Sequence, residues 1–258
     1  WASGISLVAH MQNPHTPAVH MNTRMFWTPH GWWFGGGSDL NPCIEYDEDT
    51  EHFHAVQKAH CDPHGSEIYP RYKAWADEYF FIPHRKRARG VGGIFYDDLN
   101  TGDWERDFAL TQDVGRAFLK AFVPIVEKRR VQDWTEADKE AQLVHRGLYA
   151  EYNLVYDRGT KFGLASGGRS ESTLMSLPPL VRWDYAWEPV AGGPEAELYA
   201  VQQGTIGGIA PTVDVTVTTT EVLVEMALPA SSISPFNTIK FAVGENLRAS
   251  VLHAMEPL

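Results

Sequence analysis

The side chains most able to do chemistry gather in the first third of the chain. Nine of the eleven histidines lie between His10 and His84, and imidazole exchanges protons near neutral pH and is also the commonest metal ligand. Within this stretch, His20, Asn22 and Arg24 alternate with apolar neighbours. A strand at this place therefore aims a proton carrier, an amide and a fixed cation to the same side.

A cavity can form if this strand pairs with the segment before it. Residues 4–10 and 18–27 read as two strands joined by a turn at Asn13-Pro14, which predicts an antiparallel pair. Ser6 and His10 share one face of the first strand, so the polar faces of both strands would line one cavity. The alternative is an ordinary solvated sheet face.

Three glycines and an acid follow an aromatic run at residues 32–39, Trp-Trp-Phe-Gly-Gly-Gly-Ser-Asp. Glycine lets a ligand approach the backbone closely, and Asp39 can take a proton there or pair with an N–H group. The spacing matches neither the dinucleotide-binding fingerprint nor the P-loop. The alternative is a bulge or turn that Asp39 caps.

Two further groups could bind a metal ion or an anion. His10, His20, His54 and His84 form a metal site only if the fold brings them together, since no spacing matches a zinc finger or H-E-x-x-H; the alternative is four unrelated histidines. The basic run 85–89 suits substrate carboxylates, because arginine contacts them bidentately. The alternative here is a solvated charge run. The arginines that can join this run are Arg24, Arg158, Arg169 and Arg182.

Charge and composition exclude several classes of protein. The 258 residues carry a net charge of −11, which argues against a nucleic-acid partner. No apolar run approaches the roughly 20 residues of a membrane span. Cys43 and Cys61 are the only cysteines, so neither a disulfide framework nor a cysteine-bound iron–sulfur cluster fits, and we expect a reducing cytoplasm.

The elements that must position these groups interleave strands with helices. The remaining predicted strands are an aromatic strand that stops at the glycines, residues 90–98, 151–158 and two short strands within 212–228. The predicted helices cover 48–62, 65–81, 104–130 and 135–146. Hairpin-linked amphipathic strands favour an α+β fold, an antiparallel β-sheet flanked by α-helices on both faces, over a parallel sheet.

Several long runs resemble the oxygen-dependent (aerobic) coproporphyrinogen III oxidase family. They are Ser-Leu-Val-Ala-His (6–10), Asn-Pro-His-Thr-Pro (13–17), His-Met-Asn-Thr-Arg (20–24), Trp-Trp-Phe-Gly-Gly-Gly-Ser-Asp-Leu-Asn-Pro (32–42), Tyr-Pro-Arg-Tyr-Lys (69–73), Asp-Glu-Tyr-Phe-Phe-Ile-Pro-His-Arg (77–85), Arg-Gly-Val-Gly-Gly-Ile-Phe-Tyr-Asp-Asp-Leu (89–99) and, most specifically, 151–183. They occur in family order from about Gly4 to Leu198. The resemblance divides the chain into a coproporphyrinogen III oxidase-like domain at 1–200 and a Val/Thr-rich tail at 201–258 of no recognised role.

The resemblance implies a reaction. Two propionates of coproporphyrinogen III are oxidatively decarboxylated to vinyl groups, giving protoporphyrinogen IX in haem biosynthesis, with O2 as co-substrate and carbon dioxide and hydrogen peroxide released. No organic cofactor is expected, and a divalent metal cation is contested within the family. The resemblance also implies a homodimer formed through residues 149–184.

It also assigns residues. The positions that match substrate contacts are Ser6, Asn22, Thr23, Arg24, Gly167, Gly168 and Arg169. His20 matches a proton donor, Asp39 an acid that engages the pyrrole N–H groups, and the proposed metal ligands are His10, His20, His54 and His84. We expect Asp39 to polarise or deprotonate the ring N–H while Arg24 holds the reacting propionate.

Two departures leave other functions open. The segment that family members carry ahead of the position of Ser6 is missing, and the tail after Leu198 matches nothing in the family. The alternatives are a non-catalytic tetrapyrrole-binding remnant and a histidine–metal oxygenase unrelated to porphyrins.

Overall fold

A four-stranded antiparallel sheet organises the larger part of the molecule, in the order β1-β2-β3-β6. The computed structural model describes residues 1–189, 194–204, 212–217, 222–227 and 241–242. The strands of this sheet are β1 (Ala2–Ala9), β2 (Ala18–Thr28), β3 (Gly31–Asn41) and β6 (Gly92–Leu99). The helices around it are α1 (Asp47–Cys61), α2 (Ile68–Tyr79), α3 (Trp104–Arg129), α4 (Glu136–Val155), α5 (Arg158–Ala165), α6 (Ser170–Leu174) and α7 (Pro194–Gly204).

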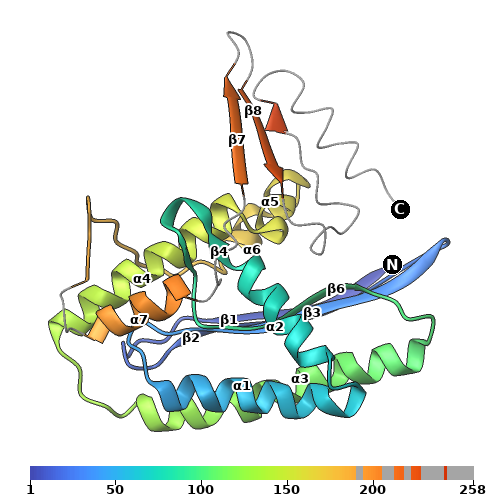
Figure 1. The fold of residues 1–258 in the computed structure, drawn as a ribbon, viewed down its shortest axis with the longest axis horizontal. Helices are drawn as coiled ribbons and strands as arrows, with labels where there is room; N and C mark the ends of the chain where they lie inside the picture. Colours follow the sequence, from blue (N-terminus) through green and yellow to red (C-terminus); the bar gives the residue numbers. More distant parts are fainter. Residues whose placement is uncertain (190–193, 205–211, 218–221, 228–240, 243–258) are drawn as a thin grey trace. The chain divides into compact units, whose positions relative to one another are not determined.

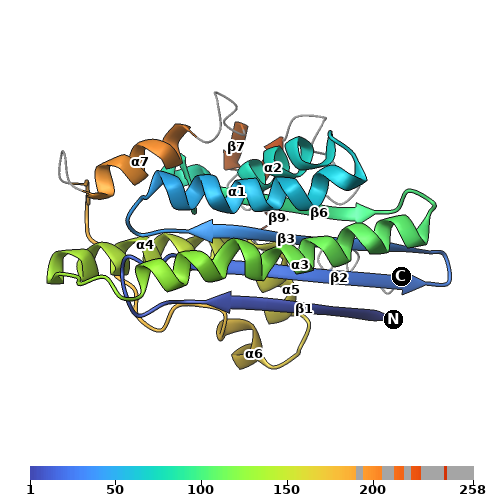
Figure 2. The same ribbon diagram turned by 90° about the horizontal axis from the view of Figure 1, so that it is seen from below.

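Helices cover both faces of the sheet. α1 and α3 lie together on one face, whereas α4 and α5 lie on the other (Figures 1 and 2). A short hairpin of β4 (Phe81–Ile82) and β5 (Arg87–Ala88) follows α2, and single 3-10 turns lie at Asp62–His64 and Pro83–Arg85. The predicted α+β class with an antiparallel sheet is confirmed.

Contacts divide the chain into two units. The first comprises Trp1–Trp27 and Trp32–Gly207, and the second comprises Thr28–Gly31 and Gly208–Leu258. In the second unit, β7 (Thr212–Val217), β8 (Val222–Ala227) and β9 (Phe241–Ala242) form an antiparallel sheet. The two short strands predicted within 212–228 are thus present, while the domain boundary at residue 200 stays a prediction.

The predicted pairing of the first two strands is confirmed. β1 and β2 are antiparallel, with Ser6 opposite Asn22. Their apolar residues face α1 and α3, where Val19 is fully buried in a core cluster that Met21 flanks. The polar residues at alternate positions therefore face α4 and α5, which positions the site described below.

Two predicted elements are wrong. The aromatic strand does not stop at the glycines, because β3 continues through them to Asn41, and glycines inside a strand mark places where other groups approach closely. Residues 151–158 are not a strand: α4 extends to Val155, and α5 begins at Arg158. Of the two tyrosines in this segment, Tyr152 is buried in the core and Tyr156 is partly buried against the same cluster.

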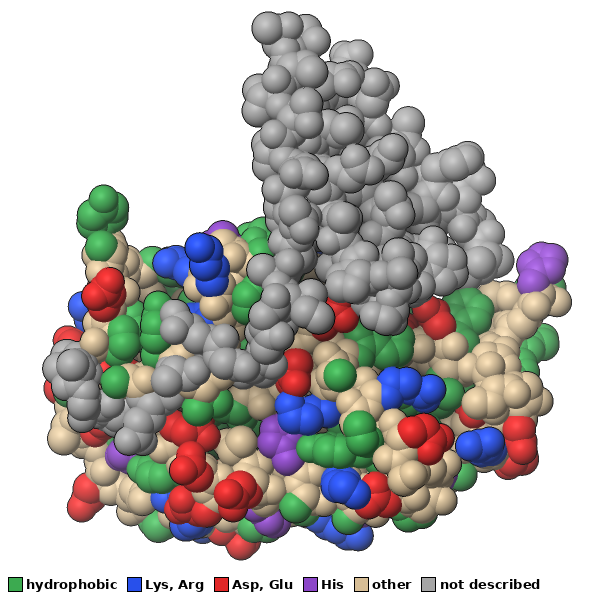
Figure 3. Space-filling view, viewed as in Figure 1, with side chains coloured by type: hydrophobic (Ala, Val, Ile, Leu, Met, Phe, Trp, Pro, Cys, Tyr) green, Lys and Arg blue, Asp and Glu red, His purple; other side chains and the backbone are tan. Residues whose placement is uncertain are grey.

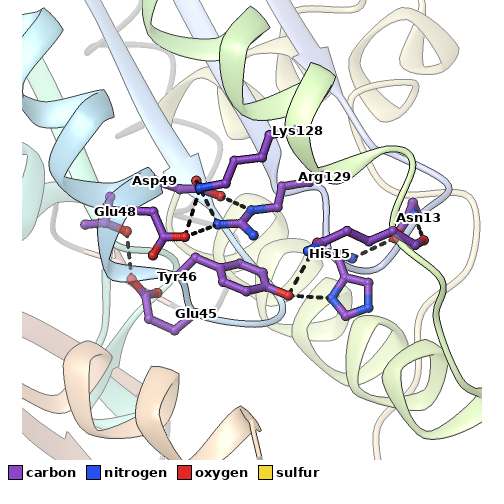
Figure 4. Close-up of polar contacts among 10 residues, drawn as sticks. Asn13, His15, Glu45, Tyr46, Glu48, Asp49, Lys128 and Arg129 are labelled. Carbon is purple, nitrogen blue, oxygen red and sulfur yellow. Dashed lines mark hydrogen bonds and ion pairs between the residues drawn. The ribbon is translucent and has the colours of Figure 1, made fainter.

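An ion-pair network joins the N-terminus of α1 to the C-terminus of α3 (Figure 4). Arg129 Nε donates to Asp49 Oδ2 at 2.6 Å and its Nη2 to Glu48 Oε1 at 2.7 Å, while its guanidinium lies 3.4 Å from the centroid of the Tyr46 ring. Acids at the start of one helix and bases at the end of the other also suit both helix dipoles. This network fixes the two helices that support the apolar face of the sheet.

The surface carries both signs of charge. On the described part of the face shown in Figure 3, acidic and basic side chains are interspersed, and neither forms a broad field. Among the described helices, none is long and apolar enough to cross a bilayer.

Candidate active site

A pocket of about 630 Å³ opens on the face of the sheet that carries the polar residues. Its floor is formed by β1, β2 and β6, and its walls by the end of α2, α4, α5 and α6. Side chains from His20, Asn22 and Arg24 form a row along β2 within it. The antiparallel pairing therefore produces a cavity, which was one of the two alternatives that the sequence left open, the other being an ordinary solvated sheet face.

The row is joined by hydrogen bonds that all run in one direction. Arg24 Nη1 donates to Asn22 Oδ1 at 2.7 Å, and Asn22 Nδ2 donates to His20 Nε2 at 3.2 Å. His20 Nδ1 in turn donates to Asp39 Oδ1 at 2.8 Å. Because Asp39 Oδ1 accepts the hydrogen bond of the Nδ1–H group, Nε2 is the nitrogen of His20 that accepts a hydrogen bond and can receive a proton.

Asp39 lies behind the pocket wall. It is 2% exposed, and its second oxygen accepts from Asn41 Nδ2 at 2.8 Å and from Arg89 Nη2 at 2.5 Å. Burial by itself would raise its pKa, but Arg89 and His20 outweigh burial and lower the pKa to about 2. Asp39 is therefore a fixed carboxylate that orients His20, and the expected direct contact with a pyrrole N–H gains no support from this geometry.

Arg89, which lines the pocket, supplies the positive charge that pairs with Asp39. Its guanidinium lies within 5 Å of three aromatic ring centroids, at 4.3 Å from Phe80, 4.4 Å from Tyr149 and 4.8 Å from Tyr152. Arg89 also donates to Asn153 Oδ1 at 3.1 Å. A buried ion pair surrounded in this way is rigid, and it keeps His20 in a fixed orientation.

A second cationic group lies at the other end of the row. Asp97 from β6 bridges Arg24 Nη2 at 3.1 Å and Arg158 Nη2 at 3.3 Å. Both arginines line the pocket, and Arg158 begins α5. Two guanidinium groups side by side can bind carboxylates.

The other predicted substrate contacts separate into two groups. Ser6 and Thr23 line the pocket. Gly167, Gly168 and Arg169 are exposed in the loop between α5 and α6 and do not line the pocket of this single chain. Their role as substrate contacts stays a prediction.

The four predicted metal ligands are not brought together. His10 bonds to the Ser176 carbonyl oxygen, His54 to that of Val91 and His84 to Glu151, whereas His20 is held by Asp39. Within the described ranges, no three histidine, cysteine, aspartate or glutamate side chains form a group fit for a metal ion. The arrangement of these donors does not fit a resident metal ion.

The basic residues of the run 85–89 do not act together at one site. Arg85 pairs with Glu151, Arg87 is buried 4.7 Å from the Tyr199 ring centroid, and only Arg89 reaches the pocket. The residue that the sequence analysis missed is Asp97. The acidic pair at 97–98 ending a strand was its one signal, and nothing in that pattern indicates which acid faces a cavity.

A comparison with protein families agrees with this geometry. A family model described as coproporphyrinogen III oxidase matches residues 1–206, which include every residue of the pocket. The chain, with its arginine- and histidine-lined pocket on an antiparallel sheet, belongs to the coproporphyrinogen III oxidase family.

Proposed function

We propose that this protein oxidatively decarboxylates two propionates of coproporphyrinogen III to vinyl groups with O2 as oxidant, giving protoporphyrinogen IX. The observation that carries the proposal is the pocket itself, which is lined by Arg24 and His20 from the sheet and by Arg158 from α5, with Asp39 bonded to His20 behind the wall. A polyanionic ring needs locally concentrated arginines in a protein of net charge −11. The family assignment supports the same substrate.

In this proposal, each propionate reacts by the same balanced step. The bond between the carboxylate carbon and its neighbour breaks and CO2 leaves. The electron pair of that bond forms the vinyl double bond to the methylene carbon attached to the ring, which loses a proton and two electrons. O2 takes up the two electrons, this proton and one further proton from water to give H2O2. The reduced macrocycle is electron-rich, so the chain supplies orientation and proton handling.

The pocket residues have separate roles in this proposal. Arg24 and Arg158 hold the propionates, and His20 Nε2 exchanges protons with the ring. Asp39 fixes the His20 tautomer and stabilises the imidazolium when it forms, as a buried carboxylate does beside a catalytic histidine. No organic cofactor is invoked.

We test the function with coproporphyrinogen III in air and under anaerobic conditions. The products are oxidised chemically and separated by their porphyrin fluorescence. We expect divinyl product in air and none without O2. Ring binding without turnover in air would favour the alternative, a tetrapyrrole-binding protein, while turnover that a chelator abolishes would favour a metal oxygenase.

We also propose a homodimer formed through residues 149–184, and a cytoplasmic location. Large apolar side chains in and beside this segment are exposed, with Met175 at 80% and Leu180 at 66%. Exposed apolar patches of this kind mark interaction sites. Cys43 and Cys61 are both free and buried, as suits a reducing compartment.

A further inference from the structure

Asp97 lies on a β-bulge that aims it into the pocket. In the β3–β6 pairing, Phe34 faces Leu99 and Gly36 faces Tyr96, so two residues of β6 oppose one residue of β3. Asp98 within the bulge has a left-handed φ of 52°, and its N–H donates to Asp97 Oδ1 at 3.1 Å. Bulges redirect side chains and are frequent beside active sites.

Gly35, opposite the bulge, makes room for the contact. A Cβ at this position would lie 2.7 Å from both Arg24 Nε and Asp97 Oδ1. Real Cβ atoms do not approach heavy atoms so closely. A larger residue at this position would therefore displace the side chain of Arg24, of Asp97 or of both from their present contact over β3.

Asp97 uses each oxygen for a different arginine. Oδ1 contacts Arg24 and Oδ2 contacts Arg158, each through a single Nη2. Neither arginine forms the two-bond fork with this carboxylate, so each keeps donors for a ligand. The formal charge of the three groups is +1, which one substrate carboxylate balances.

We infer that Asp97 is a positioning residue that spaces Arg24 and Arg158 into a clamp for one propionate. This inference rests on the proposed function. The carboxylate holds two like charges side by side that would otherwise repel, and it sets their distance before the substrate arrives. Since the clamp acts on orientation, its removal should affect the chemical step more than the binding of the ring.

The test compares two neighbouring substitutions in the full chain. Asp97→Asn keeps the size of the side chain and removes the shared charge, while Asp98→Asn makes the same change at the next position of the same bulge, which does not line the pocket. We expect Asp97→Asn to lower kcat at least tenfold at an unchanged or lower KM for coproporphyrinogen III. We expect Asp98→Asn to behave as the unaltered protein.

A raised KM with unchanged kcat, or equal behaviour of the two variants, would overturn the inference. Asp97→Glu keeps the charge but displaces the arginines by one methylene group, so its kcat should fall between those of Asp97→Asn and the unaltered protein. If the Asp97→Asn protein does not fold, the test rests on the Asp97→Glu protein. A kcat of Asp97→Glu equal to that of the unaltered protein would then overturn the inference.

Binding of coproporphyrin III, the oxidised and unreactive ring, separates this inference from the proposed function. If the unaltered protein does not turn over coproporphyrinogen III in air, the proposed function fails. The clamp is then judged by fluorescence titration with coproporphyrin III. Asp97→Asn should bind at least as tightly as the unaltered protein with a steeper salt dependence, and weaker binding contradicts the clamp.

Discussion

At the residue scale, the histidine that faces the pocket differs in its hydrogen bonds from the other histidines that the structure describes. Among these, His20 alone is joined to a buried carboxylate on one nitrogen and to a pocket amide on the other. This arrangement fixes which nitrogen meets the substrate. Replacing His20 by a neutral side chain of similar size keeps the packing but removes the group that exchanges protons with the substrate.

We therefore predict that His20→Gln lowers kcat by about 10²–10⁴-fold, the usual contribution of a general acid or base. The melting temperature should change little, because His20 is partly exposed. His52→Gln is the matched control, since His52 bonds only to the Lys120 carbonyl oxygen far from the pocket. Steady-state kinetics with coproporphyrinogen III check both, and an active His20→Gln protein would remove His20 from the chemistry.

Sequence alone could place His20, Asn22 and Arg24 on one face, but it could not place the two acids that hold them. The period of two in residues 19–25 already put His20, Asn22 and Arg24 on one face, and pairing with the previous strand needed only a turn. The position of Asp39 behind His20 depends on β3 running through the glycines beside β2. Asp97 depends on a bulge, and a bulge leaves no periodic signal.

At the element scale, the glycine run in β3 is a packing requirement rather than a turn. Gly35→Ala should displace Arg24 and Asp97 and reduce kcat at least tenfold while the fold is kept, because a 1 Å misplacement can cost 10²-fold. Gly31→Ala in the same strand meets no atom within 4 Å and should leave kcat unchanged. Circular dichroism and kinetics check the pair, and a fully active Gly35→Ala protein would show that the contact over β3 is dispensable.

The network between α1 and α3 makes a prediction about stability. Arg129→Met leaves Asp49, which is 6% exposed, without its main partner, and should lower the free energy of unfolding by about 3–5 kcal/mol. Lys128→Met removes a half-exposed partner of the same acids and should lower it by less than about 1 kcal/mol. Urea titration measures both, and equal losses would mean that the burial of Arg129 contributes nothing.

The helices show where sequence patterns are reliable. The predicted boundaries of α1 and α3 lie within one residue of those observed, because acidic first turns and long apolar stripes are local signals. The segment 151–158 predicts a strand because Tyr152, Leu154 and Tyr156 stand at alternate positions, but in the structure Tyr152 and Tyr156 pack against the core and Leu154 is exposed. A window of eight residues at a helix end is too short to separate a period of two from the 3.6-residue period of a helix.

At the scale of the whole molecule, acid stability depends on buried groups that resist protonation. Burial, with a smaller effect of Arg87, lowers the pKa of His145 to about 3, and neither ring nitrogen has a hydrogen-bond partner. The unfolded chain takes up this proton near pH 6.5. The contribution to stability is therefore complete above pH 6.5 and is lost as the pH falls toward 3.

His145→Met should remove the part of the acid-induced loss of stability that arises from His145. Between pH 7 and pH 5 the unaltered protein should lose about 2 kcal/mol of unfolding free energy through this group, at about 1.4 kcal/mol per pH unit. The variant should lose correspondingly less over the same range. Urea titrations at the two pH values measure the difference, and parallel losses in both proteins would show that His145 does not titrate as its surroundings require.

The proposed homodimer predicts that the exposed apolar side chains of residues 149–184 become buried between two copies of the chain. Leu180→Glu adds a charge inside the segment proposed as the interface, where a buried unpaired charge is strongly unfavourable. We expect it to shift the protein from dimer to monomer in analytical ultracentrifugation. Val131→Glu is the control, because Val131 is 72% exposed in the turn between α3 and α4 and lies outside the segment. A Leu180→Glu protein that sediments as a dimer would place Leu180 outside the contact between copies, and an unaltered protein that sediments as a monomer would contradict the homodimer.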